Sequence, residues 1–150
     1  MKIYRDIYDL IWKSFPVVPP ESGGIFGSGS NGIVSKFFYD AGRPDPSVAI
    51  YTPNVFLLNR VILDWAQQGI RFCGMIHSHP YGVEQLSQCD MEYIGAIRSS
   101  IKDERVQLYF PIIIPNHKFI SYVITDTAKG IFFANDPVEI IDKRDRVHSE

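Results

Sequence analysis

The stretch Ile70-Arg71-Phe72-Cys73-Gly74-Met75-Ile76-His77-Ser78-His79-Pro80 predicts a buried β-strand that runs directly into two histidines. A short and largely apolar run of this kind is typical of a strand in the interior of a sheet. Because side chains at positions i and i+2 of a strand share a face, we expect His77 and His79 to point toward one place at the end of the strand. Two such histidines can also be ordinary residues that hydrogen-bond to the backbone, so this stretch alone leaves both interpretations open.

Helical and extended patterns surround this strand. Apolar residues at helical spacing predict an amphipathic first helix, which the proline-rich run 16–20 ends: Ile3, Ile7, Leu10, Ile11 and Phe15. Thr52-Pro53 predicts the start of a second helix with Thr52 as its N-cap, and Gly69 is expected to cap its C-terminus. A third helix is predicted over 88–101, a loop over 40–47, and further strands at 25–26, 33–39, 108–114, 119–125 and 130–134, the last two as a possible hairpin.

This pattern of helices interspersed with strands around one sheet indicates the α/β or the α+β class. The 150 residues suit one domain, which we predict to span 1–150 with a charged tail over about 142–150.

Composition excludes several classes of protein. Hydrophobic residues make up 45% of the chain and charged residues 21%, which excludes a wholly disordered protein. The net charge of −2 provides no excess of cations for a phosphate backbone, so we expect no nucleic-acid partner. No apolar stretch is long enough to cross a bilayer, the first residues lack the apolar core of a secretory signal, and there are only two cysteines. We therefore expect a soluble, cytoplasmic protein with no membrane partner.

A second polar cluster, Ser87-Gln88-Cys89-Asp90, precedes and opens the predicted third helix. On its own it resembles a helix capping box, in which Ser87 and Asp90 bond to backbone amides. Its alternative role is to direct Asp90 from the first turn of the helix toward the end of the histidine strand. Two histidines and one aspartate would make three protein ligands, the number typical of a catalytic zinc site that leaves its fourth position to water.

Glu21 is the third candidate. An isolated glutamate before a strand is most simply a surface residue, but Gly23-Gly24 would allow the backbone here to pass close to another strand and carry Glu21 inward.

Together these residues have the chemistry that amide hydrolysis needs. Zinc makes hydroxide available near neutral pH, a carboxylate that is not a ligand can move the proton to the leaving amine, and a hydroxyl near the metal can stabilise the oxyanion. The candidates are Glu21 for the proton transfer and Ser87 for the oxyanion.

The combined pattern of Glu21-Ser22-Gly23-Gly24, His77-Ser78-His79-Pro80 and Ser87-Gln88-Cys89-Asp90 resembles the signature of the JAMM (MPN-plus, JAB-domain) zinc metallopeptidases, most closely the short prokaryotic members. The resemblance implies that His77, His79 and Asp90 bind one zinc ion, that Glu21 is the general acid/base, and that Ser87 assists the oxyanion. It also implies a mixed, curved sheet flanked by helices, similar to that of cytidine deaminases. The implied substrate is a protein or peptide, with cleavage of a peptide or isopeptide bond at the C-terminal tail of a ubiquitin-like or sulfur-carrier protein.

Two alternative functions bear on the same residues. A cytidine deaminase needs His-x-Glu and Pro-Cys-x-x-Cys segments, which are absent, so we expect Cys73 to be a core residue and Cys89 to face away from the site. A non-catalytic MPN-type scaffold that binds proteins remains open.

Three other residues are expected outside the ligand set. Tyr81 is expected to line a substrate groove, His117 to lie in a turn and His148 to lie in the tail.

Overall fold

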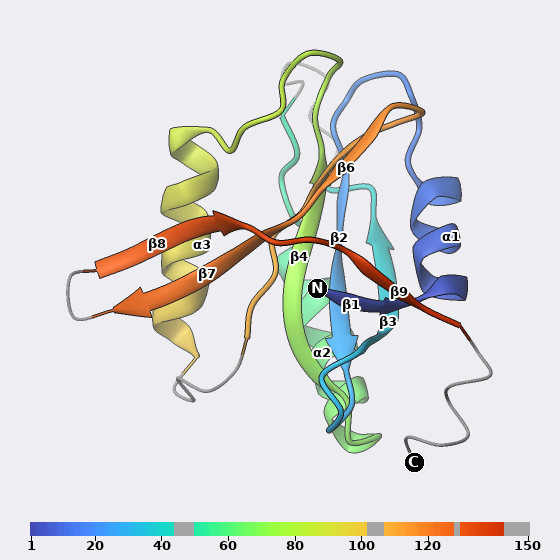
Figure 1. The fold of residues 1–150 in the computed structure, drawn as a ribbon, viewed down its shortest axis with the longest axis vertical. Helices are drawn as coiled ribbons and strands as arrows, with labels where there is room; N and C mark the ends of the chain where they lie inside the picture. The colour runs from blue at the N-terminus through green and yellow to red at the C-terminus, as the bar shows by residue number, and fades with distance from the viewer. Residues whose placement is uncertain (44–49, 102–106, 128–129, 143–150) are drawn as a thin grey trace.

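The computed structural model describes residues 1–43, 50–101, 107–127 and 130–142. In these residues a curled, mixed sheet is flanked by three helices, α1 (Arg5–Ser14), α2 (Val55–Gln67) and α3 (Gln88–Ser100) (Figure 1). This confirms the predicted α/β class. None of the helices in the described part of the chain is both long and apolar enough to span a bilayer.

The main sheet has the strand order β6-β5-β4-β2-β3-β1-β9, and β7 and β8 form a separate hairpin. The strands are β1 (Lys2–Tyr4), β2 (Gly23–Ser28), β3 (Val34–Asp40), β4 (Arg71–Ser78), β5 (Ile112–Ile114), β6 (Lys118–Ile120), β7 (Tyr122–Thr127), β8 (Gly130–Asn135) and β9 (Glu139–Ile141). The central strand β4 pairs antiparallel with β2 and parallel with β5, which makes the sheet mixed.

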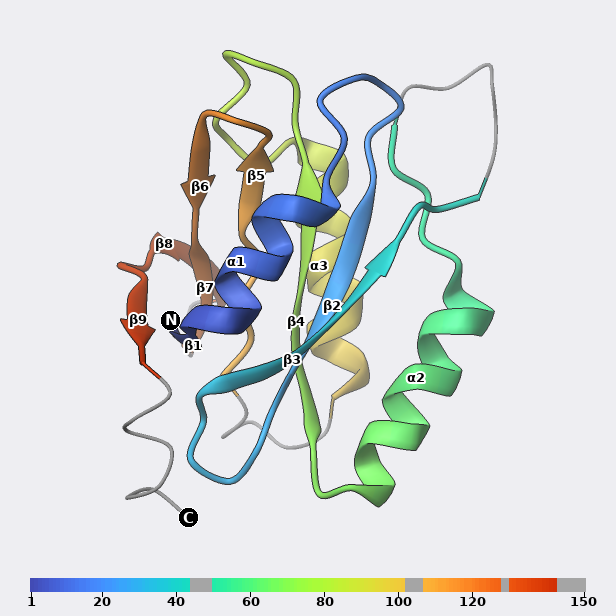
Figure 2. The same ribbon diagram turned by 90° about the vertical axis from the view of Figure 1, so that its right-hand side faces the viewer.

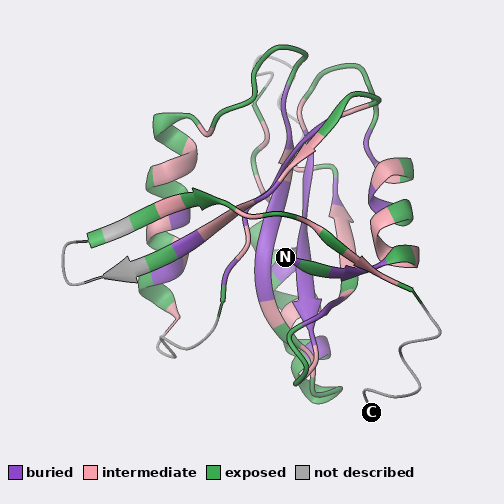
Figure 3. Ribbon diagram, viewed as in Figure 1, coloured by how far each residue is buried: buried purple, intermediate pink, exposed green. Residues whose placement is uncertain are grey.

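Helices cover both faces of the sheet. Helix α1 lies on one face and α2 and α3 lie on the other (Figure 2). Ile11 of α1 packs in one cluster with Phe26 and Ile76, whereas Leu58 of α2 and Ile94 of α3 pack in a second cluster on the opposite face. Strands β2 and β4 are buried over most of their length because both faces are covered (Figure 3).

An extra residue in β4 decides which side chains reach each face. Phe26 pairs with Gly74 but Gly27 pairs with Phe72, so Cys73 has no partner on β2 and forms a bulge. In an unbroken strand Cys73 and Met75 would share a face. Instead Cys73 packs in the cluster on the α1 side and Met75 in the cluster on the α2 and α3 side. The bulge therefore turns the following residues toward the second face.

The second helix begins later than predicted. Its N-cap is Asn54, whose side chain accepts a hydrogen bond from the amide of Leu57 at 3.3 Å, so the prediction of Thr52 as N-cap was wrong. Thr52 stays in the extended loop because its carbonyl accepts a bond from Arg43. Gly69 follows the last turn with a φ of +73°, as expected for a C-terminal cap.

Several strand predictions needed correction as well. Strand β1, which contains Ile3 of the predicted first helix, and the edge strand β9 were not predicted, and the predicted strand over 119–125 is divided at Ser121 into β6 and β7. Of the predicted strand over 108–114 only Ile112–Ile114 forms a ladder, while Tyr109 makes isolated bridges. The hairpin of β7 and β8 is confirmed. Residues 44–47 of the predicted loop and 143–150 of the predicted tail, with His148, lie outside the described residues.

We predict that Gly74→Ala lowers the free energy of unfolding by about 2–3 kcal/mol, because Gly74 has a φ of +154° and an added Cβ would overlap the carbonyl oxygen of Tyr109. Chemical denaturation measures this. Gly95→Ala in α3 is the matched control: its Cβ meets no atom within 4 Å, and it should stabilise the helix by about 0.5–1 kcal/mol. A Gly74→Ala protein as stable as the wild type would show that the bulge does not need glycine.

Candidate metal centre

Three side chains meet where β4 ends against the start of α3. His77 lies near the end of β4, His79 lies just beyond it, and Asp90 lies in the first turn of α3. One potential ligand atom from each residue lies within 4.8 Å of the other two. The Nε2 atom of His77 lies 3.2 Å from Oδ1 of Asp90, and the Nε2 atom of His79 lies 3.3 Å from Oδ2. The structure thus brings together the three residues that the sequence predicted to converge.

The imidazole of His79 is held in a defined orientation. Its Nδ1 lies 3.1 Å from the carbonyl of Val83, which fits an N–H donor there and directs Nε2, the nitrogen that carries the lone pair in the neutral ring, toward Asp90. The backbone amide of His79 donates to Ile113 on β5 at 2.9 Å, which fixes the chain at this point. A ligand histidine whose second nitrogen bonds to a carbonyl is the usual arrangement in metal sites.

Asp90 serves both the cluster and the helix. Its Oδ2 accepts a bond from the backbone amide of Ser87 at 2.8 Å, and its own amide donates to the Ser87 hydroxyl at 3.0 Å, which completes a capping box. The same carboxylate faces both imidazoles. The two interpretations that the sequence left open for Asp90 therefore hold together.

Charge in the cluster favours the ionised form of the Asp90 carboxylate. Burial raises the pKa of Asp90, but its hydrogen bonds to the two imidazoles outweigh burial and hold this pKa well below its ordinary value. Burial lowers the pKa of His79. The hydrogen bonds to Asp90 and to the Val83 backbone, together with the negative charge of Asp90, outweigh burial, so this pKa lies above its ordinary value.

The donor set suits a divalent metal ion. Two imidazole nitrogens and one carboxylate oxygen converge, and these are ligands that zinc and other transition metals accept. Metal–nitrogen bonds of about 2.0–2.1 Å in a tetrahedral site put ligand atoms roughly 3.3 Å apart. Each imidazole lies at about this spacing from one oxygen of Asp90, His77 from Oδ1 and His79 from Oδ2, so an ion bound through a single oxygen would need the carboxylate to turn slightly. The two Nε2 atoms lie 2.7 Å apart, so the rings would separate by about half an ångström to hold such an ion.

Glu21 lies beside the site, two residues before the start of β2. It is half-buried at the end of the segment that pairs with β4, where Gly23 lies opposite His77. Ser78 binds this segment closely: Ser22 donates its amide to the Ser78 hydroxyl at 2.9 Å, and the amide of Ser78 donates to the carbonyl of Ser22 at 2.8 Å. Glu21 is thereby held beside the cluster without belonging to it.

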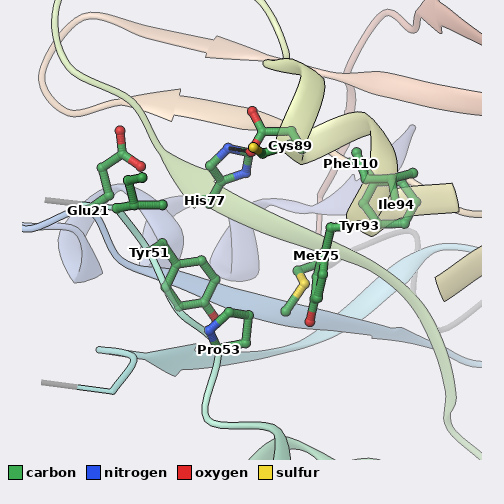
Figure 4. A pocket seen from close by; sticks show the side chains of 11 residues that line it. Glu21, Tyr51, Pro53, Met75, His77, Cys89, Tyr93, Ile94 and Phe110 are labelled. Carbon is green, nitrogen blue, oxygen red and sulfur yellow. Dashed lines mark ion pairs between the residues drawn. The ribbon is translucent and has the colours of Figure 1, made fainter. Parts of the chain in front are cut away.

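A cavity of about 210 Å³ adjoins the cluster. Figure 4 shows Glu21 and His77 at one end and Met75 and Tyr93 farther along. A second cavity of about 230 Å³ lies beside His79 and is lined by the proline-rich run 16–20, and Glu21 lines both. The site therefore has space for a ligand on two sides of the His77, His79 and Asp90 group.

The remaining candidates occupy varied positions. Ser87 is the N-cap of α3, and its hydroxyl accepts a bond from the helix while retaining its own proton for donation. Cys89 is exposed but lines the cavity beside Asp90, so the expectation that it faces away from the site was wrong. Cys73 is a buried core residue, as expected.

Tyr81 is 78% exposed, and its ring centroid lies 4.6 Å from that of His117. His117 lies in a turn, as predicted.

Sequence reasoning missed the apolar walls of the cavity. Met75 could have been found, because it lies two residues before His77 and shares its face of the strand after the bulge. Tyr93 lies three residues after Asp90 on α3, which is also a neighbouring position on a helix surface. Phe110 lies in the segment just before β5, far in sequence from His77 and from β2, and no local pattern identifies it as part of the cavity.

Comparisons with known proteins show the fold alone. No protein-family profile matches the chain, and no curated protein matches it. Among solved structures, it is similar to a protein from Desulfitobacterium hafniense, with 15% identity, a TM-score of 0.63, and coverage of 99% of this chain and 98% of that one. It is also similar to a protein from Salinibacter ruber, with 16% identity, a TM-score of 0.57, and coverage of 95% and 93%.

We predict that the protein binds one equivalent of a divalent transition metal and that His77→Ala weakens binding by at least about 100-fold, because it removes a ligand rather than an outer partner. Calorimetric titration with Zn²⁺ measures this. His117→Ala, which removes an exposed histidine from a turn, is the matched control and should bind as the wild type does. If both variants bind equally well, the ion binds elsewhere.

Proposed function

We propose that this protein is a zinc-dependent metallopeptidase of the JAMM type that hydrolyses a peptide or isopeptide bond, and that its sheet belongs to the JAB/MPN, cytidine-deaminase-like fold. The observation that carries the proposal is that Glu21 lines the same cavity as His77 and Asp90 but is not one of the three converging ligands. A hydrolytic metal site needs such a carboxylate beside the ion and free to exchange protons.

Zinc, when bound, would lower the pKa of its water from about 15.7 toward 7 and so supply a nucleophile at neutral pH. In this proposal Glu21 accepts the proton of the attacking water and delivers it to the leaving amine. The hydroxyl of Ser87 donates a hydrogen bond to the developing oxyanion. Its position at the start of α3, bonded to the amide of Asp90, supports this role.

The proposed substrate is a protein or peptide, with the C-terminal tail of a ubiquitin-like or sulfur-carrier protein as the specific expectation. Space on both sides of the cluster supports a substrate that extends in two directions from the cleaved bond. We also propose that the protein acts in the cytoplasm, which its two free thiols, Cys73 and Cys89, support.

Glu21→Gln is expected to reduce turnover by at least about 100-fold and to leave the zinc content at one ion per chain, because it removes proton transfer but no ligand. Turnover is measured with a quenched-fluorescence peptide library and with a sulfur-carrier protein extended by a reporter peptide. Metal content is measured by elemental analysis.

The same experiment separates the enzyme from the non-catalytic scaffold. A scaffold of the MPN type binds its partner without metal-dependent cleavage, so wild type and Glu21→Gln would be equally inactive. If the variant cleaves as fast as the wild type, the assigned mechanism is wrong.

Ser78→Ala should lower kcat about ten-fold while zinc binding persists, because it releases the segment that holds Glu21 in place. Ser78→Thr keeps the hydroxyl and should restore most of the rate. Steady-state kinetics on the best library peptide measures both. Full activity in the alanine variant would show that backbone pairing alone positions Glu21.

A further inference from the structure

We infer that the cavity lined by Glu21, His77 and Asp90 binds one large apolar side chain of the substrate, next to the cleaved bond. This inference rests on the proposed function and goes further, because it names the class of residue that the substrate must carry. It predicts selection for a leucine-, methionine- or phenylalanine-sized group on one side of the cleaved bond.

The cavity is polar at one end and apolar elsewhere. Glu21, His77 and Asp90 form the polar end, where the cleaved bond would lie. Beyond them the walls are apolar: Met75, Ile94 and Phe110, all buried, and the rings of Tyr51 and Tyr93. A ligand that places a polar group at the cluster must therefore place an apolar group against these walls, since an unpaired polar group there would lose its hydrogen bonds to water.

The wall formed by Tyr51 is fixed in place. Its hydroxyl donates to the buried carboxylate of Asp40 at 2.8 Å, and the same carboxylate accepts from the amides of Gly42 and Asn54, each at 2.9 Å. The ring lies directly against Gly23, where an added Cβ would overlap it. Because the carboxylate of Asp40 ties the Tyr51 hydroxyl to backbone amides of the loop, the cavity has a defined shape before any ligand binds.

The volume matches one side chain. At about 210 Å³ the cavity exceeds the engineered cavity of about 150 Å³ that holds benzene, and it falls below the range of roughly 300–1,000 Å³ typical of sites for drug-sized ligands. A large aliphatic or aromatic side chain therefore fits, and a bulky cofactor does not.

Tyr93 limits the length of this cavity. Tyr93 and Met75 also line another cavity, an apolar one of about 380 Å³ between α2 and α3. Since the Tyr93 ring stands at the junction and is partly exposed, removing it should join the two spaces at little cost to the core. Tyr93 is thus the residue expected to set the size limit for the substrate side chain.

Binding of metal-chelating probes tests the inference without requiring turnover. The zinc-loaded protein is titrated by calorimetry with two pairs of hydroxamates: N-acetyl-glycine against N-acetyl-leucine hydroxamate, and succinyl against isobutylsuccinyl hydroxamate. The pairs place an isobutyl group on opposite sides of the chelating group. We expect a gain of about 10- to 100-fold from the isobutyl group in one pair. No gain in either pair would overturn the inference.

Tyr93→Ala should shift the preference of the responsive pair toward larger groups, so that a naphthyl side chain binds at least about ten-fold better relative to isobutyl than in the wild type. Phe56→Ala is the matched control, because Phe56 is an aromatic residue 74% exposed on α2 and outside the cavity lining. An identical preference in both variants would contradict the assignment of Tyr93.

Peptide cleavage separates this inference from the proposed function. Cleavage that depends on zinc and Glu21 but shows no preference for apolar residues would overturn the inference alone. Selective hydroxamate binding without any cleavage would overturn the proposed function and leave the apolar cavity as a binding site.

Discussion

The antiparallel pairing of β2 with β4 is the interaction on which the site depends. It places Gly23 opposite His77, although 54 positions separate them in the chain, and so brings Glu21 to the cluster. The hydrogen bonds between Ser22 and Ser78 close the end of this ladder. Because both strands are covered on their two faces, the pairing is shielded from water and cannot slip by one residue without moving every side chain to the wrong face.

Asp90 links the start of helix α3 to the end of strand β4. Its carboxylate completes the capping box of α3 and faces both imidazoles at the end of β4, so one group satisfies helix amides and supplies charge to the cluster. A capping interaction typically contributes about 1 kcal/mol. The helix start is therefore held in the orientation that the cluster requires, and Cys89 is carried to the cavity with it.

Local sequence patterns predicted most helices and strands, but not the features that depend on contacts between them. The histidine strand, the start of α3 at Ser87 and the glycine after α2 follow from periodicity and capping chemistry, which act within a few residues. The bulge at Cys73, the three-residue strands β1 and β9 and the N-cap at Asn54 were missed. These features depend on partners elsewhere: a bulge needs a second strand, and a short edge strand is stabilised by its neighbour rather than by its own sequence.

The sequence by itself determined which side chains were available for chemistry, because residue type and spacing limit what can bind a metal or move a proton. The convergence of His77, His79 and Asp90 was an expectation that spacing on one strand and one helix start supports. Only the tertiary structure decided the position of Glu21, the second role of Asp90 and the apolar cavity that ends at Tyr93. The physical reason is that these depend on long-range pairing and packing, which no short stretch of sequence encodes.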